Sequence, residues 1–166
     1  VDMTTRRTSH RVWVLGAGHA SLVAALRTAG RTRRDGGEVT LVNPSDRFVE
    51  RIRLHQRAAG QQPRQLSISH MLRGTSAEFV AGHVTAIDSD QREVFLATDE
   101  GRRSLPYDAL TYALGSGTDR GSVPGVAEHA YNLSSPAAAN ALHVSLQEVA
   151  SHGGRLLVCG GFTGIE

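Results

Sequence analysis

A short apolar run that leads into two closely spaced glycines constrains this chain more than any other feature of its sequence. Residues 12–15 are typical of a buried strand, and Gly16 and Gly18 follow that strand directly. Beyond them, apolar residues at helical spacing predict a helix that ends at Gly30. A strand, a glycine turn and a helix in this order form the fingerprint of a dinucleotide-binding βαβ unit.

Each position of the fingerprint has its own physical role. Gly16 allows the tight turn, and Gly18 lets the backbone approach a pyrophosphate while supplying a backbone angle that valine reaches with difficulty. The first N–H groups of the helix and the helix dipole attract the phosphate charge. The third position carries Ser21 in place of Gly or Ala, and serine is small enough to keep helix and strand close. An ordinary βαβ unit without a ligand remains the alternative.

A second strand predicted at residues 38–42 supports a ligand site. It ends at Asn43, about 20 residues beyond the fingerprint, where an acidic residue is expected to bind ribose hydroxyls. Asn43 can donate and accept hydrogen bonds but lacks the stronger charge-assisted bond of a carboxylate.

The middle of the chain changes from helical to strand patterning. Residues 48–59 are compatible with a helix that ends at Gly60, and one of Arg51, Arg53 or Gln56 in it is a candidate to face the ligand. Loosely alternating segments then predict a small antiparallel meander inserted after the α/β start. Its strands are expected at residues 78–88, 91–97 and 103–105.

The last third of the chain returns to buried elements. A strand is expected at residues 109–114, ending in a second glycine turn, and Ser135 before Pro136 predicts the start of a helix that ends at Gly153. Another strand is expected from Arg155. Cys159 at its end is interpreted as a small buried residue rather than as a reactive thiol.

Composition excludes several classes of function. The formal net charge of +2 is too small, and the arginines too scattered, to predict a nucleic-acid partner. The single cysteine rules out an internal disulfide and a redox-active cysteine pair, and the eight histidines lack metal-site spacing, so no metal is expected. Without an apolar run near the roughly 18 residues of a membrane span or a signal-peptide core, the sequence predicts a cytoplasmic protein.

Taken together, these motifs resemble the N-terminal portion of the FAD-dependent pyridine nucleotide oxidoreductases. Among these, the chain is most similar to type II NADH dehydrogenases and to relatives of apoptosis-inducing factor and ferroptosis suppressor proteins. The first and last matching segments are specific individually, and the order and spacing of all of them carry the resemblance. The matching segments are residues 14–20, 39–44, 48–56, 107–116, 123–126 and 160–166.

The resemblance implies an α/β fold, namely a Rossmann-like FAD-binding domain with a parallel sheet and an antiparallel β-meander. The first strand of a truncated second nucleotide-binding domain would follow. The expected divisions are an FAD-binding domain at residues 9–118, a connector at 119–153 and the start of an NAD(P)H-binding domain at 154–166. The chain is accordingly expected to be a fragment that is inactive alone.

The resemblance also implies roles for individual residues, none of them catalytic and none a metal ligand. Relatives carry an acid in place of Asn43, and many carry threonine in place of Leu114. Cys159 replaces the first glycine of the NAD(P)H fingerprint. The implied cofactor residues are Gly16, Ala17, Gly18, His19 and Ala20 at the pyrophosphate, Asn43 at the ribose, Val84 at the adenine, Ala113 and Gly115 over the cofactor, and Gln56 near flavin and quinone.

The implied function is transfer of a hydride from NAD(P)H to FAD and onward reduction of an acceptor. Residues 44–60 contain no cysteine pair, so the expected acceptor is a quinone or another small molecule rather than a protein disulfide. Peripheral membrane contact is expected only through a C-terminal part outside this chain. A non-catalytic or degraded dinucleotide-binding module is the alternative, favoured by Asn43, Leu114 and Cys159.

Overall fold

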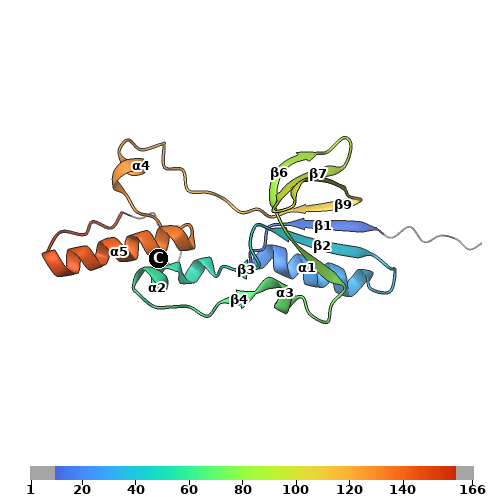
Figure 1. The fold of residues 1–166 in the computed structure, drawn as a ribbon, viewed down its shortest axis with the longest axis horizontal. Coiled ribbons are helices and arrows are strands. Elements are labelled where there is room, and N and C mark those ends of the chain that lie inside the picture. Colours follow the sequence, from blue (N-terminus) through green and yellow to red (C-terminus); the bar gives the residue numbers. More distant parts are fainter. Residues whose placement is uncertain (1–9, 160–166) are drawn as a thin grey trace, which may run out of the picture. The chain divides into compact units, whose positions relative to one another are not determined.

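Residues 10–159 are described by a computed structural model of the protein, in which the chain forms two units (Figure 1). The first unit contains residues 10–48 and 65–115, and therefore the whole glycine fingerprint. The second unit contains residues 49–64 and 116–159 of the described chain. The chain thus leaves the first unit after Phe48, returns to it at Gln65, and leaves again after Gly115.

A four-stranded parallel sheet forms the centre of the first unit. Its strands are β1 (Arg11–Leu15), β2 (Glu38–Asn43), β5 (Ala77–Ala81) and β9 (Ala109–Tyr112), in the order β5-β2-β1-β9. Val12 is in register with Val39 of β2 and with Ala109 of β9. This pairing confirms the predicted parallel α/β unit.

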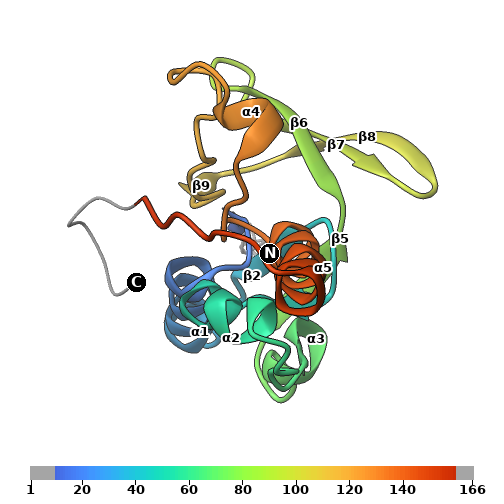
Figure 2. The same ribbon diagram turned by 90° about the vertical axis from the view of Figure 1, so that its left-hand side faces the viewer.

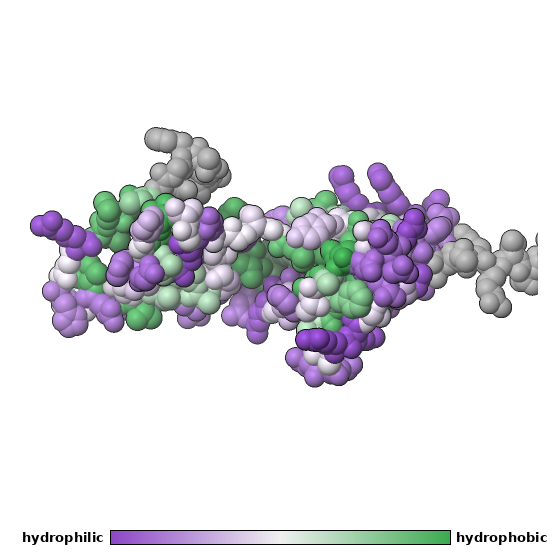
Figure 3. Space-filling view, turned by 90° about the horizontal axis from the view of Figure 1, so that it is seen from above, coloured by the Kyte–Doolittle hydropathy of each residue, from purple (hydrophilic) through white to green (hydrophobic). Residues whose placement is uncertain are grey.

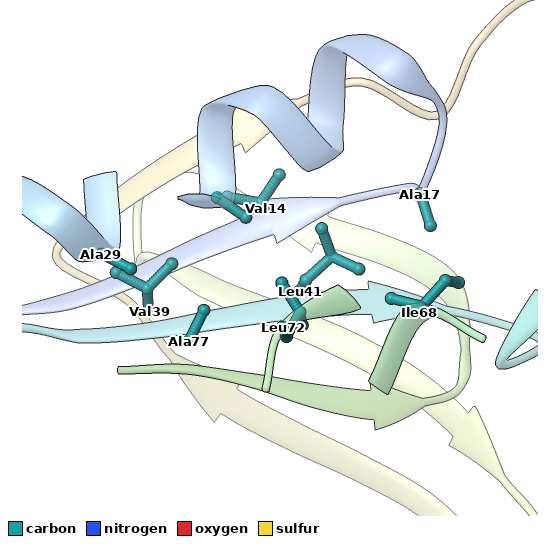
Figure 4. Packing of buried hydrophobic residues seen from close by; sticks show 9 residues of the cluster. Val14, Ala17, Ala29, Val39, Leu41, Ile68, Leu72 and Ala77 are labelled. Carbon is teal, nitrogen blue, oxygen red and sulfur yellow. The ribbon is translucent and has the colours of Figure 1, made fainter. Parts of the chain in front are cut away.

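One face of the sheet is covered by helices. These are α1 (His19–Thr32) and α3 (Ile68–Met71), which lie on the same side of the strands in Figure 2. Val14, Val39 and Leu41 point toward them, because side chains alternate between the two faces of a strand. Figure 4 shows these residues packed together with Ala29 of α1 and with the buried side chains of Ala17, Ile68, Leu72 and Ala77.

The opposite face is covered by the predicted antiparallel meander. It consists of β6 (His83–Asp88), β7 (Glu93–Thr98) and β8 (Gly101–Pro106), paired in the order β6-β7-β8. Trp13, Leu15 and Val42, which alternate with the residues facing the helices, pack against Val94 and Leu96 of β7. The meander is therefore the second cover of a sheet that is buried on both sides, as parallel sheets usually are.

The single strand predicted at residues 78–88 is wrong, because two strands meet there. β5 ends at Ala81 in the parallel sheet, and β6 begins at His83 in the meander. Between them Gly82 is buried and donates its N–H to the Asn43 carbonyl oxygen at 3.0 Å. A Cβ at Gly82 would lie 3.2 Å from Thr98 Cγ2, so a small residue suits the point where the chain changes sheets.

The helix predicted over residues 48–59 is also wrong in extent. Phe48 belongs to the short strand β3 (Arg47–Phe48), which pairs with β4 (Leu66–Ser67). Its ring meets the His19 ring edge to face, with the centroids 4.8 Å apart. Phe48 is thus held in the first unit, and only residues 51–58 remain helical, as η1 (Arg51–Arg53) and α2 (Leu54–Ala58).

In the second unit, α2 packs against α5 (Pro136–His152). The unit also contains the short helix α4 (Val126–His129), which was not predicted from the sequence. Leu54, Ala58 and Ala139 form its buried centre. The predicted start of α5 is confirmed, since Ser135 Oγ accepts a hydrogen bond from the Ala138 N–H at 3.1 Å. Figure 3 shows hydrophobic side chains at the surface of this unit, at the left of the view. The large hydrophobic residues of this unit that are exposed are Ile52, Val123, Tyr131, Leu133, Val144, Leu156, Leu157 and Val158.

Two predicted boundaries need correction. Helix α1 continues through Gly30 to Thr32, and the chain turns at Gly36, whose φ is +70°. Residues 153–159 contain no strand, and the exposed Cys159 is not the buried strand-end residue expected. Because no described strand pairs with this segment, its apolar side chains stay in solvent. The predicted glycine turn at 160–166 lies outside the described residues.

The Asp46 carboxylate accepts hydrogen bonds that hold the turn after β2. We expect these bonds to make the stability of the first unit depend on pH. Ser67 Oγ donates to Oδ2 at 2.8 Å, while the Ser69 N–H and hydroxyl donate to Oδ1 at 2.7 and 2.9 Å. Burial raises the pKa of this carboxyl, but the hydrogen bonds outweigh it and place the pKa below its ordinary value of 3.8.

We expect Asp46→Ala to destabilise the first unit by about 1–2 kcal/mol at pH 7. The folded-state pKa is lowered, so this stabilisation is present above pH 3.8 and is lost as the pH falls through the folded-state value. Urea denaturation of both proteins at pH 7 and below pH 3.8 measures the difference. An equal difference at both pH values would contradict the role assigned to the carboxylate.

Candidate dinucleotide-binding site

Apart from Val84, which lies on β6 of the meander, the residues of the first unit that are predicted to bind a cofactor lie at or just after the carboxyl ends of its parallel strands. β1 lies between β2 on one side and β9 on the other, so the strand order reverses at β1. Ligands of open α/β sheets bind in the crevice at such a switch point. The fingerprint glycines follow β1, Asn43 ends β2, and Ala113 follows β9.

Gly16 forms the tight turn predicted for it. Its φ of +96° lies in the left-handed region, and its N–H donates to the Val42 carbonyl oxygen at 2.8 Å. A Cβ at this position would lie 2.3 Å from the Ala113 carbonyl oxygen, far inside van der Waals contact. Only glycine lets the β1 turn and the β9 turn approach this closely.

Ser21 ties the first helix to the end of β9, a role that the sequence analysis missed. The side chain is only 1% exposed, and its hydroxyl donates to the Ala113 carbonyl oxygen at 3.2 Å. The Ala113 N–H in turn donates to the Leu15 carbonyl oxygen at 3.0 Å. A small polar residue at the third fingerprint position was the available signal, and it was interpreted by size alone.

Gly18 leaves open space where the helix begins. It is the N-cap of α1, with φ −76° and ψ −176°, an extended conformation open to any residue, so the predicted need for an unusual backbone angle is wrong. A Cβ there would meet no atom within 4 Å. The requirement for glycine therefore does not come from the described protein atoms.

The start of α1 fits a bound pyrophosphate. The 14-residue helix has no side-chain cap and no acidic residue in its first turn. Gly18, His19 and Ala20 are exposed, whereas Ala17 is buried. The first N–H groups of a helix lack intrahelical partners, and together with the helix dipole they favour an anion. An open Gly18 in front of uncapped N–H groups is the geometry that a diphosphate needs.

Asn43 and Val84, the residues predicted to contact the ribose and the adenine, belong to β2 and β6. The Asn43 amide nitrogen donates to the Ser45 carbonyl oxygen at 2.8 Å, and the Asn43 carbonyl oxygen accepts the Gly82 N–H. Within the described residues no donor is hydrogen-bonded to the side-chain oxygen Oδ1, which is therefore available to a ligand. Val84 follows Gly82 by two residues on β6, half-buried against the meander core. Both positions stay predictions as ligand contacts, as does Gly115, whose φ is +80°.

Gln56 and its neighbours belong to the second unit. Arg51 is occupied there, since Nη2 donates to the Ser116 and Ser134 carbonyl oxygens at 3.1 and 3.0 Å. Arg53 pairs with Glu50 at 3.7 Å. The proximity of Gln56 to a flavin stays a prediction from the resemblance.

Two further features concern residues 10–159, the part of the chain that the structure describes. No group of three or more His, Cys, Asp or Glu side chains there is arranged to hold a metal ion. Within the same residues, none of the helices combines the length and the apolar character that crossing a membrane requires.

Known proteins match the chain along most of its length. The type II NADH:quinone oxidoreductase of Staphylococcus aureus is 28% identical over 94% of this chain and 41% of the relative. That of Staphylococcus epidermidis is 29% identical over 74% of this chain and 30% of the relative. The chain thus spans less than half the length of these relatives.

Solved structures match the fold. The sulfide:quinone oxidoreductase of Aquifex aeolicus has a TM-score of 0.75 at 20% identity, over 87% of this chain and 33% of that one. The NDH2 of Plasmodium falciparum in complex with NADH has a TM-score of 0.72 at 19% identity, over 87% and 30%. The sequence pattern of one family matches residues 10–166, nearly the whole chain. The chain belongs to the pyridine nucleotide-disulphide oxidoreductase family.

Proposed function

We propose that the first unit binds FAD as part of an NAD(P)H:quinone oxidoreductase. The observation that carries the proposal is the arrangement at the end of β1, where Gly16 is packed against Ala113 and Gly18 faces open space at the start of α1. Proteins of this family use FAD as the cofactor and NAD(P)H as the co-substrate, which supports the proposal. Bound FAD would supply the hydride-accepting group.

The residues of the first unit divide the binding task. The N–H groups of His19 and Ala20 would hold the pyrophosphate, and the Asn43 side-chain oxygen would accept a ribose hydroxyl. The backbone of Val84 would pair with the adenine. Ala113 and Gly115 would close over the cofactor, because β9 is fixed beside β1 by hydrogen bonds.

The electron acceptor is proposed from two observations. The matched Staphylococcus proteins are named NADH:quinone oxidoreductases. Residues 44–60, which follow β2, contain no cysteine, so this chain offers no redox-active pair there for a protein disulfide. The cytoplasmic location and the domain boundaries at 118 and 153 stay predictions from the sequence.

Titration of the purified chain with FAD and with riboflavin tests the cofactor assignment. We expect quenching of flavin fluorescence with FAD and at least about tenfold weaker binding of riboflavin, which lacks the adenosine and pyrophosphate that these residues address. AMP would compete only weakly and ADP more strongly, because ADP contains the diphosphate. Equal affinities for FAD and riboflavin would contradict the proposal.

A non-catalytic dinucleotide-binding module is the second candidate. It is favoured by Asn43, which replaces the acidic ribose partner, and by Leu114 beside the glycine turn. NADH consumption with FAD and a soluble quinone, measured on a version of the protein extended to the full length of its relatives, separates the two candidates, because this chain spans less than half of that length and is expected to be inactive alone. Turnover supports the oxidoreductase, whereas FAD binding without reduction of the flavin by NADH supports the module.

A further inference from the structure

The turn after β2 combines an amide with several free hydrogen-bond donors. At this position of a dinucleotide site, a carboxylate accepts two bonds from the ribose hydroxyls and repels a phosphate attached to the ribose. Asn43 keeps an oxygen acceptor but has no charge. The electrostatic element that normally excludes a 2′-phosphate is therefore missing at residue 43.

The same turn offers donors and room. One hydrogen of the Asn43 amide bonds to the Ser45 carbonyl oxygen, which leaves its second hydrogen without a partner among the described residues. The Ser45 hydroxyl and N–H are likewise without partners in that part of the chain. Pro44 and Ser45 are both exposed, so these donors face solvent beyond the end of β2.

The charges of the segment point in the same direction. The neighbouring acid, Asp46, already accepts three hydrogen bonds from Ser67 and Ser69, and it is thereby held toward β4 and α3. Arg47 is exposed and forms no ion pair within the described residues. In this segment the Asp46 carboxylate is therefore already hydrogen-bonded, whereas the Arg47 guanidinium has no ion-pair partner among the described residues. A guanidinium is well suited to bind a phosphate.

We propose that Asn43 determines specificity by admitting adenosine ligands that carry a 2′-phosphate. This presupposes the proposed function, in which the first unit binds a dinucleotide at the end of β1. The unit would then accept a 2′-phosphorylated nucleotide at the site where it binds the adenosine half of FAD. NADPH, at sufficient concentration, would compete with FAD for the unloaded chain.

Titrations with ADP and with ADP carrying a 2′-phosphate test the specificity, using the whole chain and displacement of FAD as the readout. We expect the two dissociation constants of the wild type to agree within about threefold. Asn43→Asp should bind ADP more tightly and 2′-phosphorylated ADP at least about tenfold more weakly, because the new carboxylate repels the phosphate. Arg47→Gln should weaken only the 2′-phosphorylated ligand, and circular dichroism confirms that each variant is folded.

The outcomes separate this inference from the proposed function. Wild-type protein that binds ADP and FAD but rejects the 2′-phosphorylated ligand by tenfold or more would overturn the role of Asn43 and leave FAD binding intact. An Asn43→Asp variant with unchanged preference would overturn it as well. Protein that binds neither nucleotide and no FAD would overturn the proposed function, and the specificity with it.

Discussion

Replacement of Gly16 by alanine is expected to destabilise the first unit by at least about 3 kcal/mol. The new Cβ would lie 2.3 Å from the Ala113 carbonyl oxygen and 2.9 Å from the Ala113 carbonyl carbon. Both are backbone atoms, and Ala113 is held by its N–H bond to Leu15. The φ of +96° adds a further cost, because this backbone conformation is unfavourable for alanine wherever its side chain lies.

Thermal and urea unfolding of Gly16→Ala measure this effect against a control on the same segment. Gly30→Ala is that control, because Gly30 lies inside α1, is exposed, and has nothing within 4 Å of an added Cβ. It should raise stability by about 0.5–1 kcal/mol through helix propensity. If Gly16→Ala unfolded at the same temperature and urea concentration as the wild type, the turns after β1 and β9 would not be in the close contact described.

Replacement of Gly18 by valine is expected to abolish dinucleotide binding, with a loss of at least about 100-fold, and to leave most of the fold intact. The contrast with Gly16 follows from the surroundings, since a Cβ at Gly18 meets no protein atom within 4 Å. The side chain would fill the space in which the pyrophosphate approaches the N–H groups of α1. Its cost to folding should be about 1 kcal/mol, from a poorer N-cap.

FAD titration and thermal unfolding, measured on the same samples, test this separation of binding from stability. Gly30→Val places the same side chain on the same helix away from the site, and it should keep the wild-type affinity. If Gly18→Val also kept that affinity, the assignment of the pyrophosphate to the start of α1 would be wrong. If it lost its fold, Gly18 would have a structural role that its surroundings do not indicate.

The parts of the fold that could be predicted are those with strong local patterning. Residues 12–15 and 38–42 are apolar runs next to glycine or asparagine, so both strands and the helix between them follow from sequence alone. The Ser135–Pro136 pair placed the start of α5 correctly because the capping bond is local. Gly16 was assigned to the tight turn for the same reason.

The features that were missed depend on distant contacts. The break between β5 and β6 is set by the bond from Gly82 to Asn43, and residues 78–88 alone show only one alternating run. Phe48 is not part of a helix as predicted, because its ring packs on His19, 29 positions earlier in the chain. Gly18 was given a backbone role because sequence does not distinguish a glycine required by φ from one required by a ligand.

The central position of β1 has a consequence for synthesis of the protein on the ribosome. Arg11 of β1 and Asp108 beside β9 are 97 residues apart, yet β9 is the strand that covers one edge of β1. During translation β1 can pair with β2 early, but its other edge must wait until residues 109–112 have emerged. A nascent chain therefore presents an unpaired apolar strand edge until β9 has emerged, and such an edge is prone to pair with other chains before the dinucleotide site can form.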